Sequence, residues 1–184
     1  MEIRKLELPG VLLIEPKLHR DPRGYFFESF RVDALAAAGV PAFVQDNQSM
    51  STRGTLRGLH YQLDRPQGKL VRVLRGAVID VVVDIRVGSP TFGKWLVEEL
   101  SAENLRQVYV PPGYAHGFQV ISDVGEVFYK CTDYYSGVAD QRGIAWNDPA
   151  LGIPWTERQP LLSAKDTTWL PLDPARTDLP RYEK

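Results

Sequence analysis

The sequence predicts an all-β domain, and three observations indicate this fold class. Val and Ile are concentrated in short segments in the middle of the chain. Gly, Pro, Ser or Asp bound these segments, as is typical of strands joined by turns. The 15 glycines and 14 prolines are scattered, with no linker and no internal repeat. We expect residues 1–184 to form a single domain, because domains commonly span about 100 to 200 residues.

The clearest strands are predicted between residues 69 and 88. This segment is rich in Val and Ile and is broken at Gly76 and Gly88, as two β-strands would be. On one face of the second strand the side chains are Ile79, Val81, Val83 and Ile85. On the other face they are Val78, Asp80, Val82 and Asp84. Because this second face carries two carboxylates, it either lines a polar space or faces solvent.

The remaining elements follow from the same turn signals. Further strands are predicted over Trp95–Leu100, Gln107–Val110, Gly117–Ile121 and Glu126–Thr132. A short helix is predicted over Asp33–Ala38, with Asp33 as N-cap and Gly39 as its C-terminal stop. The tail after Asp148 contains six prolines. It is expected to wrap around the strands as loops and short turns.

Charge and composition argue against nucleic acid and membrane partners. The 22 Lys and Arg residues nearly balance the 23 Asp and Glu residues, so phosphate recognition must be local. The apolar stretch Val11–Ile14 is far too short for a signal or membrane segment. Cys131 is the only cysteine, which excludes an internal disulfide and suits a reducing compartment. We expect a soluble, unprocessed, cytoplasmic protein.

The sequence lacks the motifs of common cofactor and nucleophile sites. It contains no GxGxxG, P-loop, GxSxG, HExxH or paired CxxC. The three histidines, His19, His60 and His116, are therefore the first candidates for chemistry. His116 ends a PxGxxH segment, Pro111-Pro-Gly-Tyr-Ala-His116, which resembles the second motif of the cupin family. This resemblance implies a double-stranded β-helix, or jelly roll, with short helices and an irregular C-terminal tail.

Cupins that bind metal also carry a first motif containing HxH. The corresponding stretch here is His60-Tyr-Gln62, so Gln62 replaces the second ligand. Imidazole-bound divalent metals normally need three or more protein ligands, and His60 with His116 does not suffice. We expect no metal and no cofactor. A metal-dependent cupin such as a dioxygenase and a non-catalytic sugar-binding barrel are the distant alternatives.

Longer segments, spread over almost the whole chain, show a closer resemblance. They include His19-Arg-Asp-Pro-Arg-Gly-Tyr-Phe-Phe-Glu28, Gln45-Asp-Asn47, Arg57-Gly-Leu-His60-Tyr-Gln, Gln67-Gly-Lys69, Val110-Pro-Pro-Gly-Tyr-Ala-His116-Gly-Phe, Tyr129-Lys-Cys-Thr-Asp-Tyr-Tyr135 and Leu162-Ser-Ala-Lys-Asp166. Each segment alone is a weak signal. All seven, in this order, resemble the dTDP-4-dehydrorhamnose 3,5-epimerase family.

The resemblance implies an inversion of carbons beside a ketone. In a dTDP-linked 4-keto-6-deoxy sugar, the C4 ketone acidifies the protons on C3 and C5, because the carbanion delocalises as an enolate. Inversion needs a base on one face of the sugar and an acid on the other, and it needs no cofactor. His60 is the implied base, with Asp166 paired to its ring, and Tyr129 is the implied acid.

The resemblance also implies which residues hold the substrate. Lys69 suits the developing enolate oxygen, and His116 is a candidate for a hydrogen bond to the same atom. Asp80 or Asp84 is a candidate to orient either one. The implied nucleotide contacts are Arg23, Glu28, Gln45, Asp46, Asn47, Arg57 and Lys165, with Phe26 and Tyr134 as candidates for packing against the base. Among these, the guanidinium groups suit a diphosphate.

One departure from the family pattern lies between Tyr135 and Arg142, where the chain is one residue longer. Either Asp140 or Gln141 therefore takes the place of the family's glutamate contact. The resemblance further implies a homodimer and a role in dTDP-L-rhamnose biosynthesis for bacterial surface polysaccharide. The nearest alternative is an epimerase that inverts only C3 or only C5 of a related dTDP-keto sugar.

Overall fold

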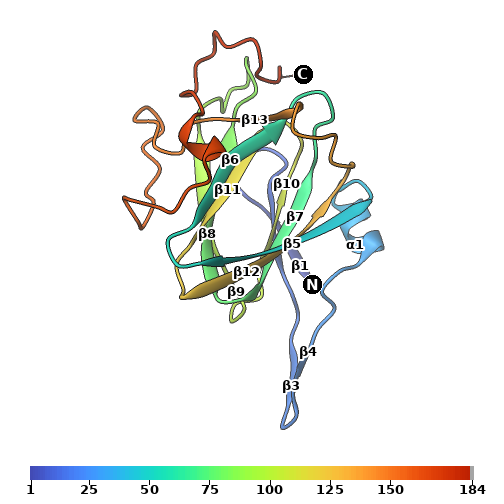
Figure 1. The fold of residues 1–184 in the computed structure, drawn as a ribbon. Helices are drawn as coiled ribbons and strands as arrows, with labels where there is room; N and C mark the ends of the chain where they lie inside the picture. The colour runs from blue at the N-terminus through green and yellow to red at the C-terminus, as the bar shows by residue number, and fades with distance from the viewer. Residues whose placement is uncertain (183–184) are drawn as a thin grey trace.

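The computed structural model describes residues 1–182. Its body consists of two antiparallel sheets that pack face to face (Figure 1). The six-stranded sheet contains, in spatial order, β1 (Glu2–Lys5), β2 (Leu12–Glu15), β10 (Gln107–Val110), β7 (Lys69–Arg75), β12 (Val124–Cys131) and β5 (Gln45–Thr52). The five-stranded sheet contains β13 (Gln141–Gly143), β6 (Leu56–Gln62), β11 (Tyr114–Val120), β8 (Ala77–Asp84) and β9 (Trp95–Ser101). This is the predicted all-β jelly roll.

The main core lies between the two sheets. Val71 and Val127 extend into it from the six-stranded sheet, and Val82 and Phe118 meet them from the five-stranded sheet. All four side chains are buried, with at most 5% of their surface exposed. Because this apolar packing fills only part of the space between the sheets, polar side chains from the same strands can line a cavity beside it.

Each sheet also buries its outer face. The C-terminal tail covers the five-stranded sheet, where Trp155 and Leu172 pack against Val81 and Val83. A segment that contains α1 (Val32–Ala37) covers the six-stranded sheet, where Leu35 packs against Leu12 and Leu70. Up to residue 182, the regular structure of the tail is one 3₁₀ turn, η1 (Lys165–Thr167), apart from isolated bridges, in agreement with its predicted irregularity.

The alternation predicted for β8 is confirmed. Val81 and Val83 face the tail, whereas Val78 and Val82 face the core between the sheets. Asp80 and Asp84 are both fully buried, so the alternative of a solvent-facing pair of aspartates is wrong. Asp84 accepts hydrogen bonds from Arg86, Ser89 and Thr91, which offsets the cost of its burial. Asp80 is bonded through Oδ2 to Nε2 of His116, and its Oδ1 has no hydrogen-bond partner within the described residues.

The predicted strand breaks and strand bounds hold to within a few residues. Gly76 forms the tight turn between β7 and β8 with a φ of +74°, and a Cβ there would lie 1.9 Å from the carbonyl oxygen of Val124. Only glycine fits this turn. Two differences are larger: β11 begins at Tyr114, three residues before the predicted start at Gly117, and β8 ends at Asp84, short of the predicted break at Gly88.

The predicted helix is present, but its start is different. The N-cap is Arg31, so the expectation that Asp33 caps the helix is wrong. Asp33 lies in the first turn of the helix. Its carboxylate binds the Arg31 guanidinium, with Nε of Arg31 3.0 Å from Oδ1 of Asp33. Gly39 ends the helix as predicted, with a φ of +85° and its N–H bonded to the carbonyl of Ala36.

A two-stranded hairpin extends away from the body of the molecule (Figure 1). It is formed by β3 (His19–Asp21) and β4 (Gly24–Phe26), and all six strand residues are exposed. Tyr25 and Phe26 are 53% and 68% exposed, which is unusual for aromatic side chains. This hairpin carries two of the predicted substrate contacts, Arg23 in its turn and Phe26 in β4.

Candidate active site

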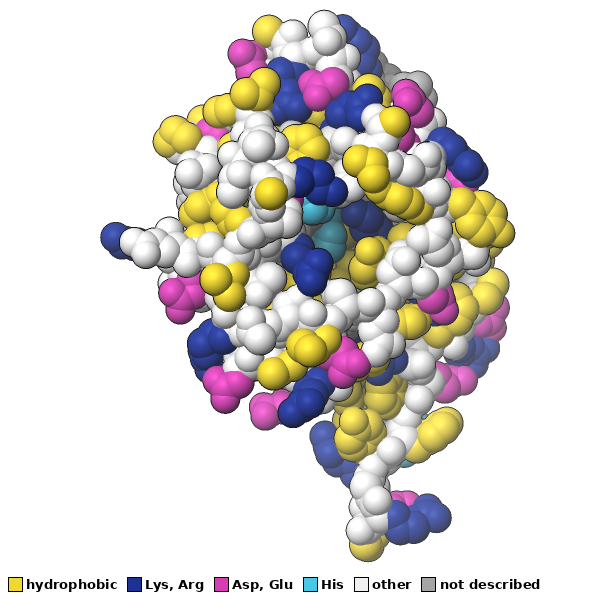
Figure 2. Space-filling view, viewed as in Figure 1, with side chains coloured by type: hydrophobic (Ala, Val, Ile, Leu, Met, Phe, Trp, Pro, Cys, Tyr) yellow, Lys and Arg dark blue, Asp and Glu magenta, His cyan; other side chains and the backbone are white. Residues whose placement is uncertain are grey.

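A cavity with a volume of about 700 Å³ opens between the two sheets. Its walls come from both sheets and from the tail: Ser49, Thr55, Leu56, Arg57, His60, Lys69, His116, Phe118, Tyr129, Gln141, Leu161, Leu162, Ser163, Ala164, Lys165 and Asp166. Figure 2 shows the opening with histidine side chains inside it and basic side chains around it. A cavity of this size accommodates a ligand as large as a nucleotide sugar.

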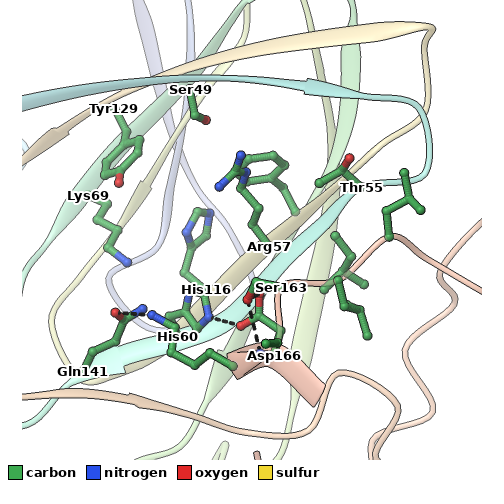
Figure 3. Close-up of a pocket in the computed structure, with 16 residues that line it drawn as sticks. Ser49, Thr55, Arg57, His60, Lys69, His116, Tyr129, Gln141, Ser163 and Asp166 are labelled. Atoms are coloured by element: carbon green, nitrogen blue, oxygen red, sulfur yellow. Dashed lines mark hydrogen bonds and ion pairs between the residues drawn. The ribbon is translucent and has the colours of Figure 1, made fainter. Parts of the chain in front are cut away.

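His60 and Asp166 form a hydrogen-bonded pair at one wall of this cavity. Nε2 of His60, on β6, lies 2.5 Å from Oδ1 of Asp166, in η1, although the two residues are 106 positions apart (Figure 3). The other carboxylate oxygen accepts a hydrogen bond from Oγ of Ser163 at 2.8 Å. The Asp166 side chain is only 3% exposed, whereas that of His60 is 22% exposed toward the cavity. The imidazole is therefore held by the carboxylate and remains accessible to a ligand.

The surroundings of this pair favour a neutral imidazole beside an ionised carboxylate. Burial lowers the pKa of His60, Asp166 partly offsets this effect, and the charges of Lys69 and Lys165 lower the pKa further. Burial would raise the pKa of Asp166, but its hydrogen bonds and the nearby imidazole together hold that pKa below the usual value. Near neutral pH, His60 can therefore accept a proton, and Asp166 can stabilise the cation that forms.

Tyr129 enters the same cavity from the opposite sheet. It lies on β12, and its hydroxyl group points into the space that His60 borders from β6 (Figure 3). Burial raises the pKa of the phenol, an effect that the charge of Arg57 only partly opposes. The hydroxyl is therefore protonated at neutral pH and is available as a proton donor.

Lys69 and His116 occupy the wall between His60 and Tyr129 (Figure 3). Lys69, on β7, is a half-buried amine whose pKa is lowered by burial, an effect that Cys131 and Asp80 partly oppose. His116, on β11, lies directly opposite His60 in the ladder, and its Nε2 atom is 2.8 Å from Oδ2 of Asp80. Both side chains can donate a hydrogen bond to an oxygen in the cavity.

The structure also separates the two aspartates of β8. Asp80 holds His116, which was one of the predicted possibilities. Asp84 lies at the end of the strand and binds Arg86, Ser89 and Thr91 instead, and it lines no part of the cavity. Of these two aspartates, only Asp80 therefore orients a cavity residue.

A basic rim surrounds the opening. Arg57 lies on β6, and its Nε atom bonds Oγ of Ser51 at 3.0 Å. Nζ of Lys165 bonds Oε1 of Gln141 at 2.6 Å. Together with Lys69, these side chains bring three cationic groups to one cavity, which favours an anionic ligand such as a phosphate ester.

Gln141, and not Asp140, faces the cavity at the extra residue in this chain. Asp140 is 5% exposed and accepts hydrogen bonds from the backbone N–H groups of Leu63, Asp64 and Arg65. Its role is therefore to fix the loop after β6. The sequence left these two residues as alternatives, because the extra residue between Tyr135 and Arg142 makes the alignment with the family pattern ambiguous there.

Six of the predicted substrate contacts do not line the cavity of their own chain. Arg23 pairs with Asp21 on the hairpin, and Phe26 and Glu28 are also exposed. On β5, Gln45 and Asn47 bond each other at 3.1 Å, and Asp46 binds Lys130 on an exposed face. Their roles remain predictions. The other seven predicted site residues, His60, Tyr129, Asp166, Arg57, Lys69, His116 and Lys165, all line it.

Three residues of the site were not anticipated from the sequence. Ser49 follows Asn47 by two positions on β5, so strand alternation would have placed it on the same face. Its Oγ is buried without a hydrogen-bond partner in the described structure. Ser163 and Trp169 both bind Asp166, and no local sequence signal marks them because the tail has no regular period.

Two structural observations concern metals and membranes. Within residues 1–182, no group of three or more His, Cys, Asp or Glu side chains is placed to hold a metal ion. The Nε2 atoms of His60 and His116 are each already bonded to a carboxylate. No helix in the described part of the chain is long and apolar enough to span a bilayer.

Comparisons with known proteins agree with this geometry. The family model for dTDP-4-dehydrorhamnose 3,5-epimerase matches residues 5–173. An enzyme of that name from Pseudomonas aeruginosa is 53% identical over 169 residues, which cover 90% of this chain and 93% of that protein. A dTDP-4-dehydrorhamnose 3-epimerase from Streptomyces niveus is 43% identical and covers 99% of this chain, with 90% of its own length matched.

A solved structure is similar over the full length. It is a dTDP-6-deoxy-D-glucose-3,5-epimerase from Legionella pneumophila in complex with dTDP-4-keto-L-rhamnose. It is 46% identical, the match covers 100% of this chain and 99% of that one, and the TM-score is 0.94. The predicted resemblance is therefore confirmed, and the chain belongs to the dTDP-4-dehydrorhamnose 3,5-epimerase family.

Proposed function

We propose that this protein inverts C3 and C5 of dTDP-4-keto-6-deoxy-D-glucose, the reaction for which its family is named, and acts in dTDP-L-rhamnose biosynthesis. The observation that carries the proposal is the placement of His60 and Tyr129 in one cavity, on opposite sheets. A flat sugar ring between them would have a proton acceptor on one face and a proton donor on the other. The names of the most similar relatives support the same reaction.

In the first step, the neutral imidazole of His60 removes the proton from the carbon beside the C4 ketone. The electron pair of the broken C–H bond moves onto the carbonyl oxygen and gives an enolate. The ionised Asp166 stabilises the imidazolium through the 2.5 Å hydrogen bond. Lys69 and His116 donate to the enolate oxygen, where charge appears only as the reaction proceeds.

In the second step, Tyr129 delivers a proton to the same carbon from the opposite face. Its high pKa keeps the phenol protonated until the enolate forms. The electron pair returns from oxygen to carbon, and the configuration is inverted. The phenolate then regains a proton from solvent, and His60 loses one, so that each inversion exchanges one carbon-bound hydrogen with water. No cofactor is needed for this chemistry.

At the nucleotide end, Arg57 and Lys165 bind the diphosphate through charge-assisted hydrogen bonds. The protein acts as a homodimer in which the β3–β4 hairpin of one copy reaches the cavity of the other. Support comes from the position of Arg23, Phe26 and Glu28, which the resemblance assigns to the substrate although they lie outside the cavity of their own chain. Such an arrangement would also cover the exposed aromatic side chains of the hairpin. The unpaired Cys131 suits the expected cytoplasmic location.

The proposal is tested by incubating the protein with dTDP-4-keto-6-deoxy-D-glucose in heavy water and locating deuterium by NMR. Deuterium at both C3 and C5, with formation of dTDP-4-keto-L-rhamnose, is the expected result. Deuterium at only one carbon would establish the single-carbon alternative, which a 43% identical relative represents. The variant His60→Asn should retain dTDP binding and lose about 10²- to 10⁴-fold in kcat, whereas normal turnover would remove His60 from its role.

A further inference from the structure

Trp169, in the tail just after η1, lies against β13, the strand that pairs with the one carrying the predicted base. A Cβ added to Gly143 would lie 2.6 Å from Cδ2 and Cε2 of the Trp169 indole, so the ring occupies the space that a side chain would take. Gly143 on β13 is the direct ladder partner of His60 on β6. The missing side chain at Gly143 therefore creates a seat for the indole at the level of His60.

From this seat the indole reaches the partner of His60. Its Nε1–H group donates to Oδ1 of Asp166 at 3.2 Å, the same oxygen that lies 2.5 Å from Nε2 of His60. The indole and imidazole rings meet edge to face, with their centroids 6.2 Å apart. Oδ1 is thus shared by two donors, while Oδ2 accepts from Ser163. These three bonds fix the orientation of the carboxylate. Because the indole N–H also binds Oδ1, this oxygen interacts less strongly with the imidazole than it would alone.

We propose that Trp169, seated on Gly143, is a positioning residue that sets how strongly Asp166 holds the protonated form of His60. The inference rests on the proposed function, because it assigns a consequence for the base of that reaction. Without the indole donor, Oδ1 would interact with the imidazole alone. The carboxylate would then stabilise the imidazolium more strongly, and His60 would hold its proton to higher pH. The carboxylate would also lose one of its orienting contacts, so the imidazole would be aimed less well.

The other charged groups that face His60 stay in place when only the indole donor is removed. They are Asp166 and Lys165 from η1, Lys69 from β7, and His116 with Asp80 from the neighbouring strands β11 and β8. Gln141 and Ser163 are neutral hydrogen-bonding neighbours. A change in the titration of His60 in a Trp169 variant therefore reports the loss of the indole and not an altered set of charges.

The test compares Trp169→Phe with Trp155→Phe. Both substitutions remove one indole N–H from the tail, but Trp155 donates to the backbone carbonyl of Trp146, away from Asp166. In Trp169→Phe we expect the acid limb of the kcat/KM profile to move up by about half a pH unit. We also expect kcat to fall about tenfold with KM nearly unchanged. Trp155→Phe should change neither quantity.

A second measurement does not depend on turnover. The titration of the His60 ring, followed by NMR in the substrate-free protein, should move to higher pH in Trp169→Phe. The variant Gly143→Ala, which forces the indole from its seat, should have the same effect. If the wild-type protein shows no epimerase activity, the proposed function fails while this titration still tests the shared oxygen. An unchanged His60 titration in folded Trp169→Phe would overturn the inference.

Discussion

His60 and His116 lie directly opposite each other on neighbouring antiparallel strands, and each ring is bonded through Nε2 to a different buried carboxylate. The bond fixes the orientation of each ring, and both rings face one cavity. The proposed roles of the two rings toward the ligand differ. His60 must accept a proton, whereas His116 must donate a hydrogen bond. Substituting the two carboxylates separately therefore distinguishes the two roles.

Asp166→Asn should lower kcat by roughly 10²- to 10⁴-fold, because the amide cannot stabilise the imidazolium. Asp166 raises the pKa of His60, so its loss should also move the acid limb of the residual kcat/KM profile to lower pH. The matched variant is Asp80→Asn, which changes the partner of His116. It should reduce kcat without moving that limb. A pH profile shifted equally in both variants would contradict the separate roles.

Asp140 is expected to stabilise the fold and not to take part in the chemistry. Burial would raise its pKa, but hydrogen bonds from Ser136 and from three backbone N–H groups lower it to about 2. Relative to the usual value of 3.8, this corresponds to about 2 kcal/mol of stability. Because the folded-state pKa is the lower one, this contribution is complete above pH 4 and is lost as the pH falls toward 2.

Urea unfolding of Asp140→Asn at pH 7 should therefore show a loss of about 2 kcal/mol. The difference from the wild type should shrink as the pH falls below about 4. Asp123→Asn is the control, because its side chain is 94% exposed and its pairing with Arg53 is a surface contact. An Asp140 variant as stable as this control at pH 7 would show that the loop does not depend on the carboxylate.

The proposed exchange of hairpins between two copies predicts complementation between inactive variants. His60→Asn lacks the base but has an intact hairpin. Arg23→Ala keeps the base but lacks the arginine of the hairpin. When the two are co-expressed, half of the dimers are mixed, and each mixed dimer contains one complete site. Activity should then reach about a quarter of the wild-type value.

Two results would argue against this arrangement. A monomeric mass in solution by light scattering would exclude the shared site directly. Activity of the co-expressed pair no higher than the sum of the separate variants would show that Arg23 does not serve the cavity of a second copy. In that case the hairpin residues would need another role, since none of them lines the cavity of its own chain.

The sequence predicted the β-structure well where alternation was strong. In β8 the two faces were assigned correctly, and the buried pair Asp80 and Asp84 was on the predicted face. Alternation could not show that only Asp80 reaches the cavity, because Asp84 lies at the strand end where Arg86, two residues later, turns back onto it. The prediction that Asp33 caps the helix was wrong for a similar reason, since Arg31 binds this carboxylate and is itself the N-cap.

The site was predicted in part, and the parts that were missed depend on tertiary structure. The resemblance brought together His60 and Asp166 across 106 positions, and the structure places them in contact. It could not show that the hairpin residue Arg23 lies outside the cavity of its own chain, because a motif carries no information about where its residues lie in the folded chain. Trp169 was missed because its role depends on the empty space at Gly143, which only the packed structure reveals.

The most direct test of the central claim is the behaviour of Tyr129→Phe in heavy water. If His60 removes the proton from one face and Tyr129 returns one from the other, this variant should still exchange hydrogen for deuterium through His60. NMR should show deuterium in recovered dTDP-4-keto-6-deoxy-D-glucose with its configuration retained, and little epimer. Formation of dTDP-4-keto-L-rhamnose by Tyr129→Phe at the wild-type rate would contradict the two-face account.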